Sequence, residues 1–308
     1  MMEYHEIPPF IYSHQTNIDI GAHVFPVRKY VDIYKKLIEE TGLAPSDFIE
    51  PQPVTPEMVM AVHLKSYWDD FSQCKWSPYT EKSEFPLFPK VVDFFLASSG
   101  GTLCASRMAC QQGIAINIGG GFHHAFPDHA EGFCFLNDVA IALQQLRKEQ
   151  LIRTVFIIDC DVHQGNGTAF IFKDDPDVFT FSIHQQNTFP IKQKSTVDIG
   201  LADGAGDLLY LSTLEKYIPS LLMSFLPDLI IYIAGADPFE KDQLGGLKLT
   251  MEGLVNRDSF ILENSRNMKI PLAIVLGGGY AIDTRDTVQI HFNTCKKAIE
   301  LYSHQDLS

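Results

Sequence analysis

The stretch "TVFIIDCDVHQGNG", which spans Thr154–Gly167, joins a short apolar run to a cluster of polar residues. Its first half is rich in β-forming residues and almost continuously apolar, which is typical of a strand buried on both faces of a parallel sheet. Asp159, Asp161 and His163 follow at every second position, and on an extended chain such residues share one face. The stretch therefore predicts a buried parallel strand with chemically active side chains at its end.

Four other segments have the same form, an apolar run followed by polar or glycine residues. They are "GIAINIGG" (Gly113–Gly120), "VFTFSIH" (Val178–His184), "DLIIYIAGAD" (Asp228–Asp237) and "PLAIVLGGGY" (Pro271–Tyr280). In open parallel sheets the active crevice lies beyond the carboxyl ends of the strands. We therefore expect the polar groups at five strand ends to converge on one site. These groups are His123 with His124, Asp159 with Asp161 and His163, Ser182 with His184, Asp237, and Gly277–Tyr280.

Helical patterns separate most of these runs. We expect helices within the segments Leu136–Gln150, Tyr210–Pro227 and Thr250–Met268. Asn137 or Asp138 is suited to cap the first helix and Thr250 the third, while Pro219 is expected to bend the second. The alternation of strands and helices predicts an α/β fold with right-handed crossovers.

The composition excludes several classes of protein. The chain has 308 residues and a formal net charge of −14, which argues against binding to nucleic acids or anionic membranes, because both need a basic surface. This charge fits a cationic partner, or simply an acidic enzyme. Hydrophobic residues make up 45% of the chain, yet no apolar run is long enough to span a membrane. Since repeats and polar linkers are absent, we expect a single domain over residues 1–308.

The cysteines and the first residues bear on the cellular location. Six cysteines are scattered without a C-x-x-C pair, which indicates reduced, mostly buried thiols. The start, "MMEYHEIPPF", lacks the basic and apolar regions of a secretory signal. Both observations favour a cytoplasmic protein, and a nuclear or organellar location stays open.

Asp161, His163 and Asp237 are the candidate metal ligands. Two carboxylates and one imidazole suit a divalent ion such as zinc, with one position left open for water. The alternative is a buried acid–histidine pair without a metal. Asp159 is expected behind a histidine, where a carboxylate fixes the tautomer and raises the basicity of the ring. Asn166 could orient a ring in the same way without a charge, or it could cap a helix.

The doublet in "GGGFHHAF" is the candidate acid–base pair. Adjacent side chains diverge in regular structure, but the glycine turn lets His123 and His124 both face the crevice, where one accepts a proton and the other donates one. The alternative is that one of them caps a helix or bonds within the core. Tyr280 follows three glycines, and its phenol can donate a hydrogen bond to a developing oxyanion. The loop has no phosphate-binding signature.

Taken together, the motifs "GGGFHHAF", "GFCFLND", "IIDCDVHQGNGTAFIF", "YIAGADPFEKDQLGGL" and "LGGGY" resemble the zinc-dependent histone deacetylase family. Their order and spacing match across most of the chain, and "HVFPVRKY" and "VHLKSYW" fit as well. The combination of "HQGNG", "DQLGGL" and "LVNRD" is most similar to the class IV branch and its bacterial relatives.

The resemblance implies a three-layer α-β-α fold of the arginase/deacetylase type around a central, mainly parallel sheet. It also implies zinc, or ferrous iron in its place, on Asp161, His163 and Asp237. His123 and His124 match the tandem acid–base pair. Asp159 would then stand behind His123 and Asn166 behind His124, and Tyr280 would polarise the acyl carbonyl. Many members of the family carry Asp at the position of Asn166, so His124 would be less strongly polarised here.

The resemblance implies three further features. The tunnel for the acyl-lysine stem would be lined by Gly132, Phe133, Phe189 and Gly278. A structural monovalent cation, potassium or sodium, would lie near Asp159, Asp161, His163, Ser182 and Ile183. Arg28 would line an internal product channel. The related arginases hold two metals with a D-x-H-x-D segment, but the second Asp position is Gly165 here, which favours one metal and disfavours a ureohydrolase.

The expected reaction is removal of an acetyl or longer fatty acyl group from the ε-amino group of lysine in proteins or peptides, with His124 protonating the leaving amine. A second hypothesis is an acetylpolyamine or other small-molecule amidohydrolase, which would need an acidic gate such as Glu84. A third is a non-catalytic module that binds acyl-lysine. The segment Phe71–Pro89, rich in aromatic residues and proline, is expected to be a long loop, either a functional rim or a simple connection.

Overall fold

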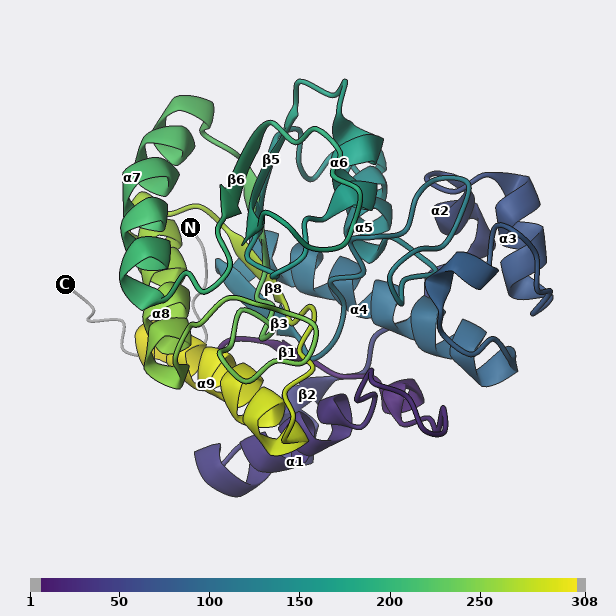
Figure 1. Cartoon of the computed structure of the whole chain (residues 1–308), viewed down its shortest axis with the longest axis horizontal. Coiled ribbons are helices and arrows are strands. Elements are labelled where there is room, and N and C mark those ends of the chain that lie inside the picture. Colours follow the sequence, from purple (N-terminus) through teal and green to yellow (C-terminus); the bar gives the residue numbers. More distant parts are fainter. Residues whose placement is uncertain (1–6, 304–308) are drawn as a thin grey trace.

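The five apolar runs form five adjacent strands at the centre of one sheet in the computed structural model, which describes residues 7–303 (Figure 1). They are β3 (Ile114–Asn117), β4 (Val155–Asp159), β5 (Val178–Gln185), β7 (Leu229–Ile233) and β8 (Leu272–Val275). The described sheet has eight strands in the order β2-β1-β3-β8-β7-β4-β5-β6. Every pairing in it is parallel, so the prediction of an α/β fold with a mainly parallel central sheet is confirmed.

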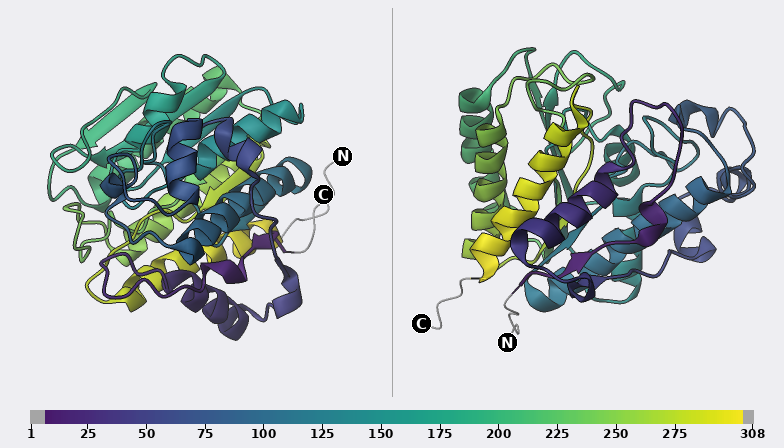
Figure 2. Two further views of the ribbon diagram at one scale, coloured as in Figure 1. Left: turned by 90° about the vertical axis from the view of Figure 1, so that its right-hand side faces the viewer. Right: turned by 90° about the horizontal axis from the view of Figure 1, so that it is seen from below.

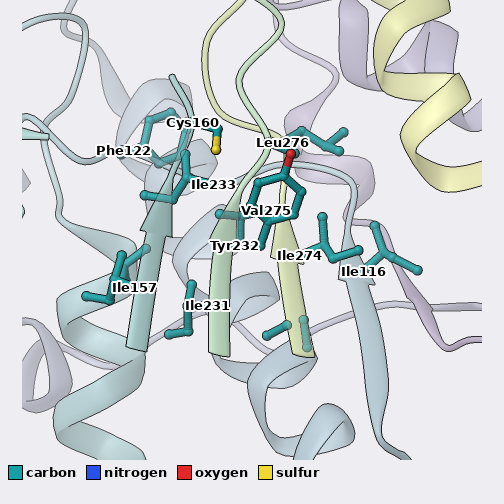
Figure 3. Packing of buried hydrophobic residues seen from close by; sticks show 14 of the residues in the cluster. Ile116, Phe122, Ile157, Cys160, Ile231, Tyr232, Ile233, Ile274, Val275 and Leu276 are labelled. Carbon is teal, nitrogen blue, oxygen red and sulfur yellow. The ribbon is translucent and has the colours of Figure 1, made fainter. Parts of the chain in front are cut away.

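Branched apolar side chains fill both faces of the central strands. Ile157 on β4 is paired in register with Ile231 on β7, and Ile274 on β8 pairs with Ile116 on β3. Figure 3 shows these side chains packed together over neighbouring strands, and all four are buried. Burial of each such side chain contributes about 1.5–3 kcal/mol to folding, so the centre of the sheet is a firm base for the loops at its carboxyl edge.

Three outer strands were not predicted from the sequence. They are β1 (Phe10–Ile11), β2 (Phe48–Ile49) and β6 (Val197–Leu201). The first two contain only two residues each, too few to produce a periodic pattern. The third lies at the sheet edge and alternates between half-buried and exposed positions, so it lacks the continuous apolar run of a central strand.

Helices cover both faces of the sheet. The described α-helices are α1 (Lys29–Thr41), α2 (Pro56–Met60), α3 (Lys65–Ser72), α4 (Pro89–Gln112), α5 (Asp138–Lys148), α6 (Asn166–Phe172), α7 (Asp207–Phe225), α8 (Met251–Met268) and α9 (Thr284–Ser303). In Figures 1 and 2, α7, α8 and α9 lie on one side of the sheet, with α1 packed on α9, and α4, α5 and α6 lie on the other. The predicted three-layer architecture is thereby confirmed. Among residues 7–303, we find no helix with the length and apolar character needed to cross a bilayer.

Two of the three predicted helices begin at the predicted caps, whereas α7 begins at Asp207, three residues before the predicted segment. Asn137 caps α5, because its side chain accepts a hydrogen bond from the backbone N–H of Ala140 at 3.0 Å. Thr250 caps α8 by accepting one from Gly253 N–H at 2.9 Å. Pro219 lies inside α7, which continues through it as one helix.

The longest described helix, α4, was not predicted, because its central "SSGG" has a low helix propensity. The two glycines serve close packing instead. A Cβ on Gly100 would lie 2.0 Å from the carbonyl oxygen of Gln52, and one on Gly101 would lie 2.4 Å from Asn117 Oδ1. These glycines therefore let the helix lie directly against the end of β3.

Candidate active site

The polar residues at the ends of the five central strands gather at one edge of the sheet, as predicted. The residues that follow β3, β4, β7 and β8 face one another and are almost completely buried; they are His123, His124, Asp159, Asp161, His163, Asp237 and Tyr280. The two polar residues of β5 behave differently. Ser182 Oγ and His184 Nδ1 are hydrogen-bonded to each other at 2.9 Å, and neither belongs to the metal-ligand cluster described next.

Asp161, His163 and Asp237 form a cluster that could hold a metal ion. One potential ligand atom from each residue lies within 4.8 Å of the others. His163 Nδ1 is 3.2 Å from Asp161 Oδ1 and 3.4 Å from Asp237 Oδ2. Backbone amides hold the carboxylates in place, because Gly278 N–H donates to Asp161 Oδ2 and Val162 N–H donates to Asp237 Oδ1, both at 2.8 Å.

The electrostatics of this cluster favour a cation. Asp237 Oδ2 is buried and has no hydrogen-bond partner among the described residues. Burial and the neighbouring charge on Asp161 raise the pKa of Asp237 to about 7. Burial alone would lower the pKa of His163, but the hydrogen bond to Asp161, the close contact with Asp237 and the charges of both carboxylates outweigh it and raise this pKa to about 10. A divalent ion between the three side chains would satisfy the orphaned oxygen and the excess negative charge, so the residues fit a metal.

The two histidines of the doublet have different partners. His123 Nδ1 donates to Asp159 Oδ2 at 2.6 Å, whereas His124 Nδ1 lies 2.7 Å from the amide oxygen of Asn166. Their Nε2 atoms face each other at 3.1 Å. The glycine turn therefore aims both rings into one crevice, and the predicted pairing of carboxylate with His123 and amide with His124 is present in the geometry.

The partners make the two rings electrostatically unequal. Burial lowers the pKa of His123, but the Asp159 and Asp161 carboxylates outweigh it and raise the pKa to about 9. Burial and the positive charge on His123 hold the pKa of His124 well below its usual range. One ring is therefore suited to carry a positive charge, and the other to accept a proton.

Gly165 lies directly behind the His123–Asp159 pair. A Cβ at this position would be 2.4 Å from Asp159 Oδ2 and 3.1 Å from His123 Nδ1. The position that supplies a second carboxylate in two-metal relatives thus has no room for a side chain. This crowding supports the expectation of one metal.

The expected tunnel residues lie around the two histidines and the metal-ligand cluster. The Phe189 ring is 5.1 Å from the His124 ring and is 47% exposed, while the Phe133 ring is 5.7 Å from that of Tyr280. A Cβ on Gly132 would come within 2.6 Å of His124 and 2.9 Å of Phe189. A cavity of about 20 Å³ beside these residues is lined, among others, by Gly132, both histidines of the doublet, Tyr280, and Asp161 and His163 of the metal-ligand cluster.

Gly278, expected as a tunnel residue, lies directly against the candidate metal ligands. A Cβ there would lie 2.2 Å from Asp237 Oδ2 and 2.6 Å from Asp161 Oδ2, so this glycine forms the floor against the candidate metal ligands. The predicted monovalent-cation residues lie near one another, since Asp159 pairs in register with Ser182 across β4 and β5. The cation itself stays a prediction.

Tyr280 is buried at the other side of the crevice. Burial, followed by the charges of Asp161 and Asp237, raises its pKa well above 10, so the phenol keeps its proton and can donate it in a hydrogen bond. The motif "DQLGGL" holds this residue: Tyr280 N–H donates to Asp242 Oδ2 at 2.7 Å, and Gln243 N–H donates to the Tyr280 carbonyl at 3.1 Å.

Three residues that hold the site together were not predicted from the sequence to belong to it. Asp138 accepts hydrogen bonds from the backbone of Gly121 at 2.9 Å and Phe122 at 2.7 Å, which orders the loop before the histidines. Asp242 holds the backbone at Tyr280. Lys29 is buried, and its Nζ donates to the Gly277 carbonyl at 2.7 Å. All three lie in motifs quoted from the sequence: Asp138 in "GFCFLND", Asp242 in "DQLGGL" and Lys29 in "HVFPVRKY".

The expectation for Arg28 is wrong. Its side chain is 73% exposed and lies 3.9 Å from Asp32 on the surface. The next residue, Lys29, takes the internal position, because Arg28 precedes the first turn of α1 and points outward. Burial lowers the pKa of Lys29 to about 8, and the Asp237 and Asp161 charges only partly offset this effect.

The long segment after α3 lies beside the turn that contains Gly132 and Phe133. Apart from a short 3₁₀ turn at Glu81–Ser83, it is irregular until α4 begins at Pro89. The carbonyl of Ser83 accepts a hydrogen bond from Phe133 N–H at 2.8 Å, and that of Tyr79 accepts one from Ala130 N–H at 2.8 Å. The segment therefore packs against the turn that carries the tunnel residues.

Comparison with known proteins agrees with this geometry. Residues 23–295 match the family described as "Histone deacetylase domain". Histone deacetylase 2 of Arabidopsis thaliana is 30% identical over 296 residues, which cover 90% of this chain and 76% of that protein. The chain belongs to the histone deacetylase family.

Other proteins are similar to this chain over much of their length. An uncharacterized protein of Picosynechococcus sp. is 38% identical over 282 residues, covering 91% of this chain and 94% of that protein. The acetoin utilization protein AcuC of Staphylococcus aureus is 28% identical over 268 residues, covering 79% and 68%. The crystal structure of the HDA15 HD domain superposes with a TM-score of 0.81 at 20% identity, covering 98% of this chain and 91% of that one, which shows the shared fold.

Membership of the histone deacetylase family confirms the family resemblance and makes the chain a hydrolase of the deacetylase type. Members are typically metal-dependent, and the buried Asp-His-Asp cluster could bind the ion. The class IV placement, zinc as the ion, the cytoplasmic location and the single domain stay predictions; the limits 1 and 308 lie outside the described residues.

Proposed function

We propose that this chain is a metal-dependent hydrolase that removes an acetyl or similarly short acyl group from the ε-amino group of lysine in a protein or peptide. The observation that carries the proposal is the arrangement of three candidate metal ligands, two unequal histidines and a buried tyrosine around one cavity. Asp161, His163 and Asp237 would hold the ion, and we take zinc as the first candidate because three protein ligands with one open position are the arrangement of catalytic zinc sites. When bound, the ion would supply a Lewis acid for the acyl carbonyl and lower the pKa of water.

The two histidines have different roles in the proposed reaction. The depressed pKa of His124 keeps this ring neutral, so its Nε2, which faces His123 Nε2 at 3.1 Å, is the atom that would accept the proton of the attacking water. When the C–N bond breaks, the same ring protonates the departing lysine amine, which restores the neutral histidine. His123, whose pKa is raised by Asp159, carries the positive charge that stabilises developing negative charge nearby.

Tyr280 completes the site from the opposite side. Its phenol keeps its proton because burial and the neighbouring carboxylates raise its pKa. It can therefore donate a hydrogen bond to the oxygen of the acyl group as negative charge develops there. The hydrogen bonds from Tyr280 and Gln243 along the "DQLGGL" segment hold its backbone in position for this contact.

The size of the cavity favours a short acyl group. Its volume is about 20 Å³, whereas one water molecule already needs roughly 10–15 Å³. A cavity this small favours a short acyl group such as acetyl over a long acyl chain, which would need the wall residues to move. Phe133 and Phe189 supply apolar surface for the methylenes of the lysine stem.

The test compares substrates that differ from an acetyl-lysine peptide either in the acyl chain or in the amine that carries it. An acetyl-lysine peptide, a myristoyl-lysine peptide and an acetylated polyamine are each incubated with the zinc-loaded protein, with and without a chelator. We expect turnover of the acetyl-lysine peptide alone and its loss on chelation. Preference for the polyamine would support the small-molecule alternative, in which exposed Glu84 beside the rim would act as the acidic gate. Binding of the peptide without any turnover would replace the proposal by the non-catalytic module.

A further inference from the structure

A tight turn beside the tunnel brings a carboxylate to the back of the second histidine. Glu131 and Cys134 exchange two backbone hydrogen bonds, of 3.1 and 2.9 Å. Between them, Gly132 and Phe133 have positive φ values of 53° and 63°, the conformation of a type I′ turn. On the side away from the tunnel, Glu131 Oε1 accepts a hydrogen bond of 2.7 Å from Asn166 Nδ2.

This contact decides which way the Asn166 amide points. A carboxylate can only accept hydrogen bonds, whereas a primary amide has one donor end and one acceptor end. With its Nδ2 directed at Glu131, Asn166 must present Oδ1 to His124 Nδ1, 2.7 Å away. In the opposite orientation the amide oxygen would face the carboxylate oxygen at the same short distance, which is repulsive.

The orientation of the amide in turn selects the tautomer of His124. An oxygen acceptor requires the proton on Nδ1, which leaves the lone pair of Nε2 in the crevice, 3.1 Å from His123 Nε2. Were the amide reversed, its N–H would face Nδ1, and the neutral ring would carry its proton on Nε2 instead. Such a ring has no lone pair in the crevice to receive a proton.

We propose that Glu131 is a positioning residue, which fixes the direction of the Asn166 amide and thereby keeps His124 protonated on Nδ1 and open at Nε2. His123 is hydrogen-bonded directly to the Asp159 carboxylate. His124 is instead connected to the Glu131 carboxylate through the amide of Asn166. The claim about the tautomer stands on the hydrogen bonds alone, and its effect on rate rests on the function proposed above.

The surroundings of Glu131 keep it in the accepting state. His129 Nε2 lies 3.5 Å from Glu131 Oε2, and the same histidine pairs with Asp128 through Nδ1 at 2.6 Å. Burial raises the pKa of Glu131, but the hydrogen bonds from His129 and Asn166 outweigh it and lower the pKa overall. Lys82 from the rim loop adds a weaker attraction.

The decisive variant is Glu131→Gln. It keeps the shape of the side chain and a hydrogen bond to Asn166, but that hydrogen bond can then run in either direction. A glutamine can accept from the Asn166 amide or donate to it, so both orientations become possible. We expect nitrogen-15 NMR of the zinc-loaded protein to show one His124 tautomer, protonated on Nδ1, in the wild type and a mixture in Glu131→Gln. Glu131→Ala should give the same mixture, and Asp128→Asn, which alters only a neighbouring carboxylate, should leave the single tautomer.

Kinetics of the same variants test the consequence for catalysis. Glu131→Gln should lower kcat roughly tenfold, the lower end of what loss of an outer partner costs, with KM little changed. Asn166→Asp should also lower it, since two carboxylates would then meet. The double variant Glu131→Gln with Asn166→Asp should recover most of the rate, because the glutamine can donate to Asp at position 166 and that carboxylate holds the proton on His124 Nδ1. A merely structural role for Glu131 predicts additive losses instead.

The outcomes separate this inference from the proposed function. A single Nδ1 tautomer retained in both Glu131→Gln and Glu131→Ala overturns the role of Glu131, whatever the activity. A tautomer shift in a protein without deacylase activity supports the role of Glu131 and removes the proposed function. Additive losses in the double variant also overturn the inference.

Discussion

Acidification should destabilise this protein through one buried histidine, His63. Its ring Nδ1 lies 2.9 Å from the Phe126 carbonyl, and its Nε2 accepts a hydrogen bond of 3.1 Å from the backbone N–H of Asn137. In the neutral ring, Nδ1 donates to the Phe126 carbonyl and Nε2 accepts from Asn137. A proton on Nε2 would remove the acceptor for Asn137. Burial lowers the pKa of His63 to about 4, although the hydrogen bond to Phe126 works in the opposite direction.

The sign and the size of the effect follow from these values. An unfolded histidine has a pKa of about 6.5, so between about pH 6.5 and about pH 4 the unfolded chain binds more protons at this residue than the folded one. The stability is fully present above the unfolded pKa and falls as the pH falls through this window. Between about pH 7.5 and about pH 5, the contribution of His63 should decrease the free energy of unfolding by about 2 kcal/mol.

The assay compares wild type with His63→Gln by urea denaturation, followed through the fluorescence of Trp68 and Trp76 at fixed zinc concentration. The variant has a constant penalty from lost contacts, but it lacks the titrating ring, so the stability difference between the two proteins should shrink by about 2 kcal/mol on acidification. His129→Gln should show the opposite sign, because hydrogen bonding to Glu131 raises the pKa of His129 despite partial burial. A difference between wild type and His63→Gln that stays constant from about pH 7.5 to about pH 5 would refute this reasoning.

Three further perturbations test the site directly. Tyr280→Phe should lower kcat by roughly 100-fold or more, because an oxyanion donor is lost, while metal content measured by atomic emission stays unchanged; near-normal turnover contradicts the assigned role. Gly165→Ala should lower activity at least roughly tenfold, because its Cβ would lie 2.4 Å from Asp159 Oδ2, and an Ala variant with wild-type kcat would show that the His123–Asp159 pair tolerates displacement. Zinc at about 100 times its Kd should stabilise the protein by about 2.7 kcal/mol in calorimetry, an effect that Asp237→Asn should abolish; equal stabilisation of both proteins would place the ion elsewhere.

The sequence predicted the centre of the sheet well and its edges poorly, for a physical reason. Strands such as β4 and β7 are buried on both faces, so every position is apolar and the signal is strong. The two-residue strands β1 and β2 contain no period at all. Helix α4 was hidden by Gly100 and Gly101, whose value lies in close contact with Gln52 and Asn117 rather than in helix propensity.

In the candidate site, too, some residues could be predicted from the sequence pattern and others could not. Asp161, His163 and Asp237 follow strong strands, so their convergence could be predicted from the topology. Asp138 was weighed only as a helix cap, yet Asn137 caps α5 and Asp138 binds the backbone amides of the loop before His123. Contacts of this kind, between a side chain and distant main-chain groups, leave no periodic trace in a sequence.

The four-residue turn at Glu131–Cys134 has a consequence for protein engineering. It carries Gly132 and Phe133 toward the tunnel and Glu131 toward Asn166. A designer who widens the tunnel at residue 132 or 133, to admit bulkier acyl groups, also moves the neighbour that contacts Asn166. Under the proposed function, selectivity and turnover would therefore depend on the same loop. Libraries should therefore vary positions 131, 132 and 133 together, and screen for rate as well as for preference.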